Sequence, residues 1–297
     1  MTAIVLGAAA GGGFPQWNCQ CPVCRLAWSG DPRVKPRTQA GLAVSADCEH
    51  WILLNASPDL RAQILATPEL HPRGQSRGSP IAAVVLTGAE VDQISGLLTL
   101  RERQAFTLFA TTETIAAVTA SPIFAVLADV VTRKTVERDL PFSLPGGIEA
   151  ELFAVPGKVA LYLEGDAPAL AAETGANVGV EIVFGSRRLA YVPGAAAMTP
   201  AMRERLARAD VVFFDGTLFS DDEMIVTGTG GKTGRRMGHM PLAGDDGTLA
   251  ALAGLGDRRI LTHINNTNPI LIQGSAERRR VEAAGFEVAE DGMEIVL

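Results

Sequence analysis

The sequence predicts an α/β fold in which residues 1–297 form a single two-layered domain. Short runs rich in Val, Ile, Leu and Phe alternate along the chain with segments whose apolar residues recur at helical spacing. No linker, low-complexity segment or internal repeat interrupts this alternation, and the length is sufficient to bury a large core. We therefore expect interleaved strands and helices from end to end.

In the first half, the strands are predicted by short apolar runs bounded by Gly, Pro, Asn or Ser. Helices are predicted at residues 60–66 and 114–120. Another helix is expected to begin after Gly88, because the leucines that follow have helical spacing. The expected strands are residues 1–6, 40–45, 51–55, 81–86, 106–110 and 124–131, of which the second and third form a hairpin.

The second half repeats this alternation. An amphipathic helix is expected at residues 199–209 and a shorter helix at 281–284. Residues 177–184 and 189–192 flank a Gly-Ser-Arg-Arg turn, which predicts a hairpin. The other expected strands are residues 148–155, 211–214, 259–262, 286–288 and 294–297.

Composition and charge argue against several classes of protein. The formal net charge of −7 lacks the basic footprint that binding to nucleic acid or to an acidic membrane surface requires. No apolar run reaches the roughly 18 residues of a membrane span, and residues 1–14 lack the basic start of a secretion signal. We therefore expect no nucleic-acid or membrane partner and a cytoplasmic location. The oligomeric state stays open, with a homodimer as one alternative.

Three of the four cysteines, Cys19, Cys21 and Cys24, fall within six residues. A turn brings such thiols to one side of the chain, and Zn²⁺ binds thiolates at about 2.3 Å in structural sites. Three unrelated buried thiols are the alternative, but cysteine is scarce in the rest of the chain. We expect a reducing compartment and a structural zinc in a Cys-rich loop at about residues 14–30. A fourth ligand must come from elsewhere.

Three buried strands that are far apart in the sequence each lead to polar side chains. The first leads to Glu90, Asp92 and Gln93, the second to Asp215, and the third to His263. A carboxylate at the end of an apolar strand costs desolvation energy unless a cation meets it. Asp92 alone is equally suited to cap the following helix. Asp215 and His263 favour a shared metal site instead.

Longer stretches carry a family resemblance. They are residues 7–19 (GAAAGGGFPQWNC), 54–59 (LNASPD), 214–217 (FDGT), 232–239 (KTGRRMGH) and 263–269 (HINNTNP). With the strand-end residues, they resemble the metallo-β-lactamase superfamily and, within it, the coenzyme PQQ synthesis protein B family over nearly the whole chain. The resemblance implies an αβ/βα sandwich of two packed mixed sheets with helices on the outer faces. Its site would lie at the strand-end edge between the sheets.

The superfamily motif H-x-H-x-D-H corresponds here to Gly-Ala-Glu-Val-Asp-Gln at residues 88–93. Both leading histidines are absent, and residues 155–158 lack the histidine that the superfamily often places there. The resemblance therefore implies an active-site metal held by Asp92, Asp215 and His263. Related proteins commonly have His in place of Gln93, whose amide oxygen is a poorer ligand for iron or zinc.

Two further residues acquire roles through the resemblance. His239 matches a region where phosphodiesterase-like relatives have a general acid, so catalysis is assigned to His239 together with Asp215. A hydrogen-bonded core histidine is the alternative for His239. Asn266 falls where phosphonate-related relatives have the histidine that completes the cysteine zinc site. Its amide oxygen, or a water, is the expected fourth ligand.

The implied function is a step in the biosynthesis of pyrroloquinoline quinone (PQQ). Related proteins are implicated in hydroxylating the tyrosine ring of a Glu-Tyr precursor with non-haem Fe²⁺ and O₂, although the site as isolated is equally suited to Zn²⁺. Lys158, Arg235 and Arg236 are candidates to bind the carboxylates of this small molecule. One alternative is a non-catalytic carrier of PQQ or its precursor toward the periplasm. Another is a scaffold stabilised by the cysteine zinc alone.

Overall fold

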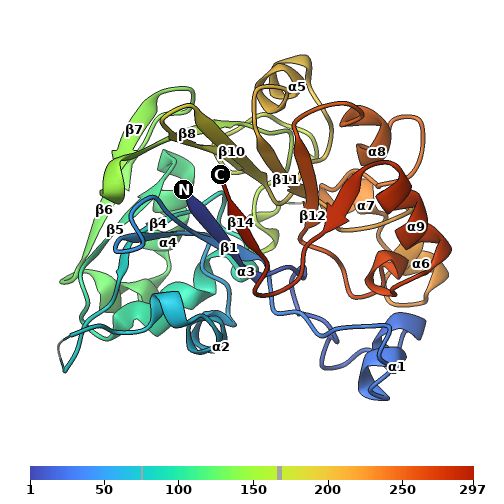
Figure 1. The fold of residues 1–297 in the computed structure, drawn as a ribbon, viewed down its shortest axis with the longest axis horizontal. Coiled ribbons are helices and arrows are strands. Elements are labelled where there is room, and N and C mark those ends of the chain that lie inside the picture. Colours follow the sequence, from blue (N-terminus) through green and yellow to red (C-terminus); the bar gives the residue numbers. More distant parts are fainter. Residues whose placement is uncertain (75, 166–168) are drawn as a thin grey trace.

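Two seven-stranded mixed sheets pack face to face in the computed structural model, which describes residues 1–74, 76–165 and 169–297 (Figure 1). The strand order is β14-β1-β2-β3-β4-β5-β6 in the first sheet and β13-β12-β11-β10-β9-β8-β7 in the second. The first sheet contains β1 (Thr2–Gly7), β2 (Gly41–Ser45), β3 (Trp51–Leu54), β4 (Ile81–Val85), β5 (Phe106–Ala110), β6 (Val131–Thr135) and β14 (Glu294–Val296). The second contains β7 (Pro141–Leu144), β8 (Ile148–Ala154), β9 (Val178–Phe184), β10 (Arg187–Val192), β11 (Val211–Asp215), β12 (Arg258–Thr262) and β13 (Phe286–Val288).

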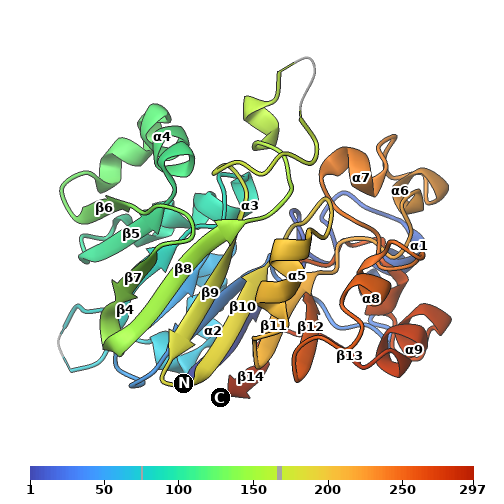
Figure 2. The same ribbon diagram turned by 90° about the horizontal axis from the view of Figure 1, so that it is seen from above.

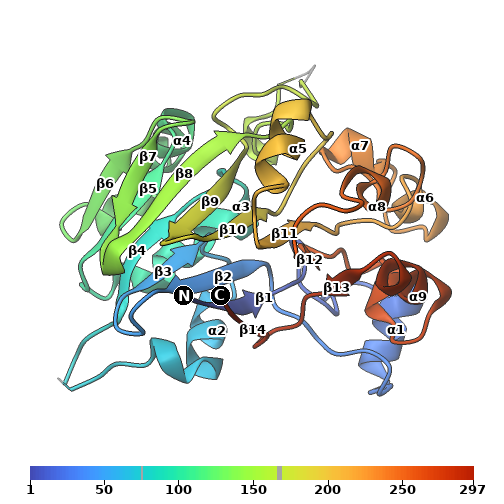
Figure 3. The same cartoon turned by 45° about the horizontal axis from the view of Figure 1, so that its top comes forward.

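Helices cover the outer face of each sheet, which confirms the predicted αβ/βα sandwich. The helices against the first sheet are α2 (Leu60–Ala66), α3 (Val91–Ile94) and α4 (Thr112–Ala120). Those against the second are α5 (Pro200–Leu206), α8 (Thr248–Ala251) and α9 (Ala276–Ala283). Figure 3 shows α1 (Pro22–Trp28) on the same side of the molecule as α6 (Glu223–Val226) and α9. None of the helices in the described part of the chain is both long and apolar enough to cross a membrane.

Alternation along the strands separates the apolar layers. On β11, Val211 and Phe213 point between the two sheets, whereas Val212 and Phe214 point toward the outer helices. Asp215 has the same parity as Phe213, so its carboxylate lies at the edge of the layer between the sheets. A polar group is tolerated in this layer only because partners meet it at the strand end.

Most predicted elements lie within one or two residues of their expected bounds, but the strand predicted at residues 124–131 is wrong. A 3₁₀ helix occupies Pro122–Leu127, and β6 begins only at Val131. Phe124 and Leu127 are both buried, and their spacing of three suits a helical turn better than a strand. Short apolar runs leave this choice to the tertiary structure. Strand β7 and the helices α1, α6, α7 (Gly234–Met237) and α8 were not predicted. Helix α9 begins at Ala276, five residues before its expected start.

The predicted site residues lie at one end of the two sheets. In Figure 2, α3 and α7 are at this end, and the two chain ends are at the opposite one. Two isolated β-bridges tie loops together at this end, one between Gly88 and Asn177 and one between Ala9 and Ile264. Each bridge joins a loop that follows a strand of the first sheet to a loop next to a strand of the second sheet. The two sheets are therefore held together at the end where the site residues lie.

Gly96→Ala is expected to destabilise the fold by about 2 kcal/mol or more. A Cβ at this position would lie 2.2 Å from the backbone oxygen of Ser57, and that backbone cannot move without displacing the segment beside α3. Gly231→Ala is the matched control, because a Cβ there meets nothing within 4 Å. Urea unfolding of both variants measures the difference, and equal midpoints would contradict the prediction.

Candidate metal centres

The register of β11 and β12 places two predicted ligands side by side. The strands run parallel with Asp215 opposite Thr262, so His263 follows directly beyond the same edge. Asp215 is fully buried, and the side chain of His263 is 12% exposed. Together with His239, they present ligand atoms that all lie within 4.8 Å of one another.

The backbone turns sharply at His263, which has a φ of 55°. This left-handed conformation is costly for a residue other than glycine. It is held by two hydrogen bonds with the loop after β1: the Ile264 N–H donates to the Ala8 oxygen at 2.8 Å, and the Ala10 N–H donates to the Ile264 oxygen at 2.9 Å. The hydrogen-bonded turn at residues 263–264, and not β12 itself, therefore sets the direction of the imidazole.

Asp92 approaches from the first sheet on helix α3. Its Oδ2 lies 3.0 Å from Nε2 of His263. The helix is capped by Glu90 and begins at Val91, so the alternative that Asp92 is the N-cap is wrong. Asp92 instead occupies the first turn, where the helix N-terminus favours a negative charge.

Asp215 accepts four hydrogen bonds. Its Oδ2 accepts from the Ala195 N–H at 2.9 Å and lies 2.7 Å from Nδ1 of His239. Its Oδ1 accepts from the Thr217 N–H at 3.0 Å and from the Thr217 hydroxyl at 2.6 Å. These contacts come from Ala195, Thr217 and His239 and fix the orientation of the carboxylate.

His239 reaches the same cluster from the end of α7. Gly238 follows the helix with a φ of 88°, a left-handed C-cap that glycine adopts without strain. The next residue then turns back toward the strand ends, and its ring stacks on that of His263 with centroids 5.2 Å apart. His239 also lines the cavity described below, unlike a histidine sealed in the core.

The electrostatics of the cluster favour a cation. Burial opposes ionisation of Asp92, but the hydrogen bond and charge of His263 hold the pKa of Asp92 below its ordinary value. Burial opposes ionisation of Asp215 as well, and the charge and hydrogen bond of His239 lower its pKa. Burial opposes the charge of His263, whose pKa is nevertheless raised by the hydrogen bond and charge of Asp92. Protons and a metal ion would compete for these groups.

The donor atoms form two pairs with the spacing of neighbouring ligands on a metal ion, and those of Asp215, His239 and His263 all lie within 4.8 Å of one another. His263 Nε2 and Asp92 Oδ2 are 3.0 Å apart, and His239 Nδ1 and Asp215 Oδ2 are 2.7 Å apart. Two ligand atoms at about 2.1 Å from an ion and at right angles to each other are about 3.0 Å apart. Imidazole and carboxylate both suit zinc and iron. These residues therefore fit a transition-metal ion.

Gln93, predicted as a weak ligand, uses its amide oxygen locally. Its Oε1 accepts from the Glu90 N–H at 3.2 Å, within the first turn of α3. At Gly88, the first position of the motif, a Cβ would lie 2.9 Å from the backbone oxygen of Ala176. A side chain is therefore excluded where the superfamily has its first histidine.

An ion pair replaces the second histidine of the motif. Glu90 Oε1 lies 2.9 Å from Nζ of Lys158, which also lies 2.8 Å from Oε1 of Glu164. Burial opposes the charge of Lys158, but the hydrogen bonds that its ammonium donates to Glu164 and Glu90 raise its pKa. The ammonium is thus a fixed cation beside the metal cluster, balanced by two carboxylates.

A cavity of about 530 Å³ connects these groups to solvent, with Asp92, His239 and His263 in its wall. The cations in its wall are Lys158, Lys232 and Arg236. Arg235, a predicted substrate ligand, is not among the described lining residues.

The guanidinium of Arg235 instead pairs with Asp246 at 2.6 Å. Successive residues of a helix point about 100° apart, so Arg235 and Arg236 on α7 cannot face the same space. The prediction that Arg235 binds the substrate is therefore wrong.

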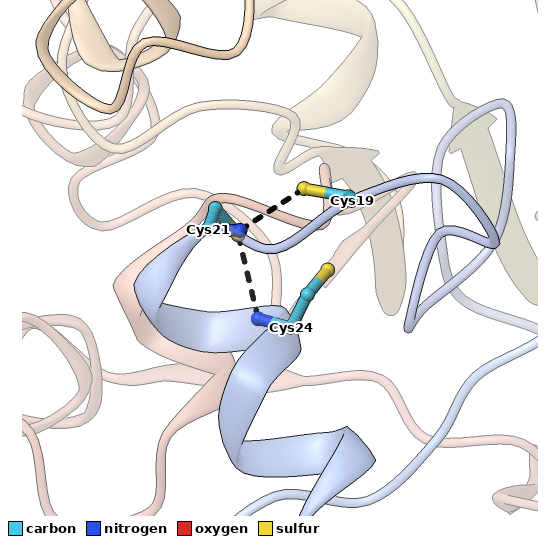
Figure 4. Close-up of side chains that lie close together, drawn as sticks. All are labelled: Cys19, Cys21 and Cys24. Atoms are coloured by element: carbon cyan, nitrogen blue, oxygen red, sulfur yellow. Dashed lines mark hydrogen bonds between the residues drawn. The ribbon is translucent and has the colours of Figure 1, made fainter.

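The three clustered cysteines form a second candidate centre (Figure 4). Cys19, Cys21 and Cys24 are buried at the start of α1, with sulfur atoms within 4.8 Å of one another. The hydrogen bond from Cys24 lowers the pKa of Cys21 to about 5, whereas that of Cys24 is raised. The cluster therefore favours a thiolate at Cys21, and the thiolate is the form of cysteine that binds metals.

Asn266 lies at this cluster, as predicted for the fourth ligand. Its Nδ2 is 3.1 Å from the Cys19 sulfur and 3.3 Å from the Cys24 sulfur. Rotating the amide by 180° presents Oδ1 to the same space, because the two atoms are nearly equal in size. The four side chains therefore fit a structural zinc.

Three residues around the first centre were missed by the sequence analysis: Thr217, Lys232 and Glu164. Thr217 stands two residues after Asp215, and this spacing of a carboxylate and a hydroxyl after a buried strand was an available signal. Nothing local distinguishes Lys232 or Glu164 from solvated surface charges.

Comparisons with known proteins show which family the chain belongs to. The beta-lactamase superfamily domain model matches residues 50–264. Coenzyme PQQ synthesis protein B from Methylobacterium nodulans is 55% identical, with 100% of both chains covered. The protein of that name from Gluconacetobacter diazotrophicus is 54% identical, with 98% of each covered.

Solved structures agree. Zn²⁺-bound PqqB from Methylobacterium extorquens matches with a TM-score of 0.98 at 52% identity, and 100% of each chain is covered. A diphosphatase of the PhnP family, with a TM-score of 0.69 and 22% identity over 100% of this chain and 97% of that one, shares the fold. The chain therefore belongs to the coenzyme PQQ synthesis protein B family of the beta-lactamase superfamily.

Proposed function

We propose that this protein acts in PQQ biosynthesis as a non-haem iron hydroxylase of the tyrosine ring in a Glu-Tyr precursor. The observation that carries the proposal is the convergence of Asp92, Asp215, His239 and His263 at the strand ends, in a chain of this family. Asp92, His239 and His263 lie in the wall of one cavity, and Asp215 is buried directly behind His239. These four residues would hold the metal. Iron bound there would supply the activation of O₂, and a reductant would supply the two electrons that convert the second oxygen atom to water.

The cavity wall has the chemistry that a Glu-Tyr molecule needs. Val91 and Leu161 line it and are 57% and 58% exposed, which offers apolar surface to an aromatic ring. Lys232 and Arg236 line it as cations and suit the substrate carboxylates. Arg236 is held more loosely than Lys158, because its one ion pair, with Glu164, is 3.6 Å long. Lys158 is already bound by two carboxylates, so its role is to balance charge beside the metal cluster.

Residues 88–93, which lack the histidines of the superfamily motif, argue against two-metal hydrolysis. A two-metal mechanism needs an ion on each side of the reacting group. Here the second cation is the ammonium of Lys158, and Gly88 has no room for an imidazole. A single metal with oxygen and nitrogen ligands is therefore the arrangement that the proposal requires.

The test is to load the protein anaerobically with Fe²⁺, then to add O₂, ascorbate as reductant and a Glu-Tyr dipeptide. The expected product has gained one oxygen atom on the tyrosine ring, read by mass spectrometry. His263→Ala is expected to lose the product, whereas His50→Ala keeps it, because His50 is an exposed histidine paired with Asp47. No gain in mass after verified iron loading, together with tight binding of PQQ, would support the carrier instead.

A further inference from the structure

Thr217 occupies the centre of the ligand cluster although it is not itself a ligand candidate. It lies two residues beyond Asp215, the last residue of β11, and is only 4% exposed. Its Oγ1 lies 2.6 Å from Asp215 Oδ1, 2.9 Å from His263 Nδ1 and 3.1 Å from His239 Nδ1. One hydroxyl thus contacts three of the four proposed ligands.

The direction of these hydrogen bonds follows from counting protons. A threonine hydroxyl has one proton to donate and two lone pairs. The shortest contact is to Asp215, and hydrogen bonds to a charged acceptor are the stronger ones. The backbone oxygen of His263 is a further acceptor, but at 3.0 Å it lies farther away than Asp215 Oδ1 at 2.6 Å. The proton therefore goes to Asp215 Oδ1, and Oγ1 accepts from Nδ1 of His263.

This direction fixes the state of His263. If Oγ1 accepts, then His263 Nδ1 must carry a proton, and in the neutral ring the lone pair resides on Nε2. Nε2 faces Asp92 Oδ2 at 3.0 Å. Without a metal, a proton on Nε2 makes this contact a hydrogen bond to Asp92; when that proton leaves, Nε2 and Oδ2 are both free to bind one ion.

Thr217 is itself held rigidly. Its N–H donates to Asp215, and its carbonyl oxygen accepts from the Asn265 N–H at 3.0 Å and from the Asn268 side-chain amide at 3.3 Å. The hydroxyl therefore cannot follow the imidazole if the ring turns. Such fixed partners orient metal-binding histidines and raise metal affinity.

We propose that Thr217 is a positioning residue that holds His263 with its proton on Nδ1, so that Nε2 is presented to the active-site metal. This inference rests on the metal centre of the proposed function but not on the hydroxylation reaction. It concerns which nitrogen binds the metal and how tightly. A binding measurement therefore tests it without any turnover.

The test compares Thr217→Val, which keeps the shape and removes the hydroxyl, with Thr217→Ser, which keeps the hydroxyl. Thr262→Val is the matched control, because Thr262 is a buried threonine beside His263 whose hydroxyl has no partner among the described residues. Zn²⁺ is the probe, titrated into each protein after the cysteine cluster has been filled. We expect Thr217→Val to weaken this binding by about 10–100-fold. The Ser and control variants should stay within about threefold of the wild type.

Nitrogen-15 NMR of the histidine rings supplies a readout that a merely structural role would not move. The chain has four histidines, so the spectrum resolves into four rings. In the Zn²⁺-loaded wild type, His263 should show a protonated Nδ1 and a metal-bound Nε2. Thr217→Val should show a mixture of tautomers for the metal-free ring.

Several outcomes would overturn the proposal. Wild-type affinity in Thr217→Val, or metal bound through Nδ1 of His263 in the wild type, contradicts it. If Thr217→Val does not fold, the wild-type spectrum and failure of Thr217→Ser to keep the affinity still decide. Absence of any Zn²⁺ at this centre in the wild type would instead remove the metal centre and with it the proposed function.

Discussion

Asp215→Asn is expected to lower metal affinity at the strand-end centre by at least about 100-fold while the cysteine cluster keeps its zinc. Asp215 is fully buried, and both of its oxygens accept hydrogen bonds. An asparagine amide turns one of these acceptors into a donor that faces other donors. It also removes the negative charge that stabilises positive charge on His239 and His263. We expect a loss in the free energy of unfolding of about 3 kcal/mol, because a buried charge partner disappears.

Asp210→Asn is the control for this variant. Asp210 lies immediately before β11, at the end remote from the site, and accepts a hydrogen bond from the Arg188 N–H at 2.7 Å. Elemental analysis should find two metal equivalents in the control and one in Asp215→Asn. Two equivalents in both proteins would show that Asp215 does not hold a metal.

Cys24→Ser is expected to lose the structural zinc and to destabilise the protein strongly. The Cys24 side chain is fully buried, and its sulfur lies 3.3 Å from the Asn266 amide. Zinc at about a thousand times its dissociation constant stabilises the folded state by about 4 kcal/mol, and this contribution disappears with the thiolate. Thermal unfolding and elemental analysis measure both losses.

Cys48→Ser is the matched control, because Cys48 is exposed in the turn between β2 and β3. A chelator should lower the melting temperature of the wild type and of Cys48→Ser but leave Cys24→Ser nearly unchanged. If the chelator destabilises all three equally, the cysteine cluster does not hold the stabilising ion. Paired with His263→Ala, which should lose only the other metal, this variant separates an enzyme with two centres from a scaffold with one.

The sequence predicted the site best where a metal-binding residue type directly follows a buried strand. Asp215 and His263 follow apolar strands, and parallel strands deliver their carboxyl ends to one edge, so their meeting could be foreseen. The three cysteines could also be predicted to form one site, because they lie within six residues of one another in the sequence.

Other features depend on how distant loops come together. His239 reaches Asp215 only because Gly238 reverses the chain after a short helix that was not predicted. The partners of Lys158 lie on two separate segments, so neither ion pair has a local signature. The strand prediction for residues 124–131 was wrong for a different reason. A short apolar run fits a helical turn and a strand equally well, and only the packing of the core decides between them.

The ammonium between Glu90 and Glu164 has a consequence for cells that are short of metals. A lysine is part of the chain, so a chelator cannot remove it, another ion cannot replace it, and oxygen does not change its charge. Lys158 therefore keeps one positive charge in this wall of the cavity whatever the supply of iron or zinc. A shortage of iron or zinc would therefore change the charge of the metal centres but not that of Lys158.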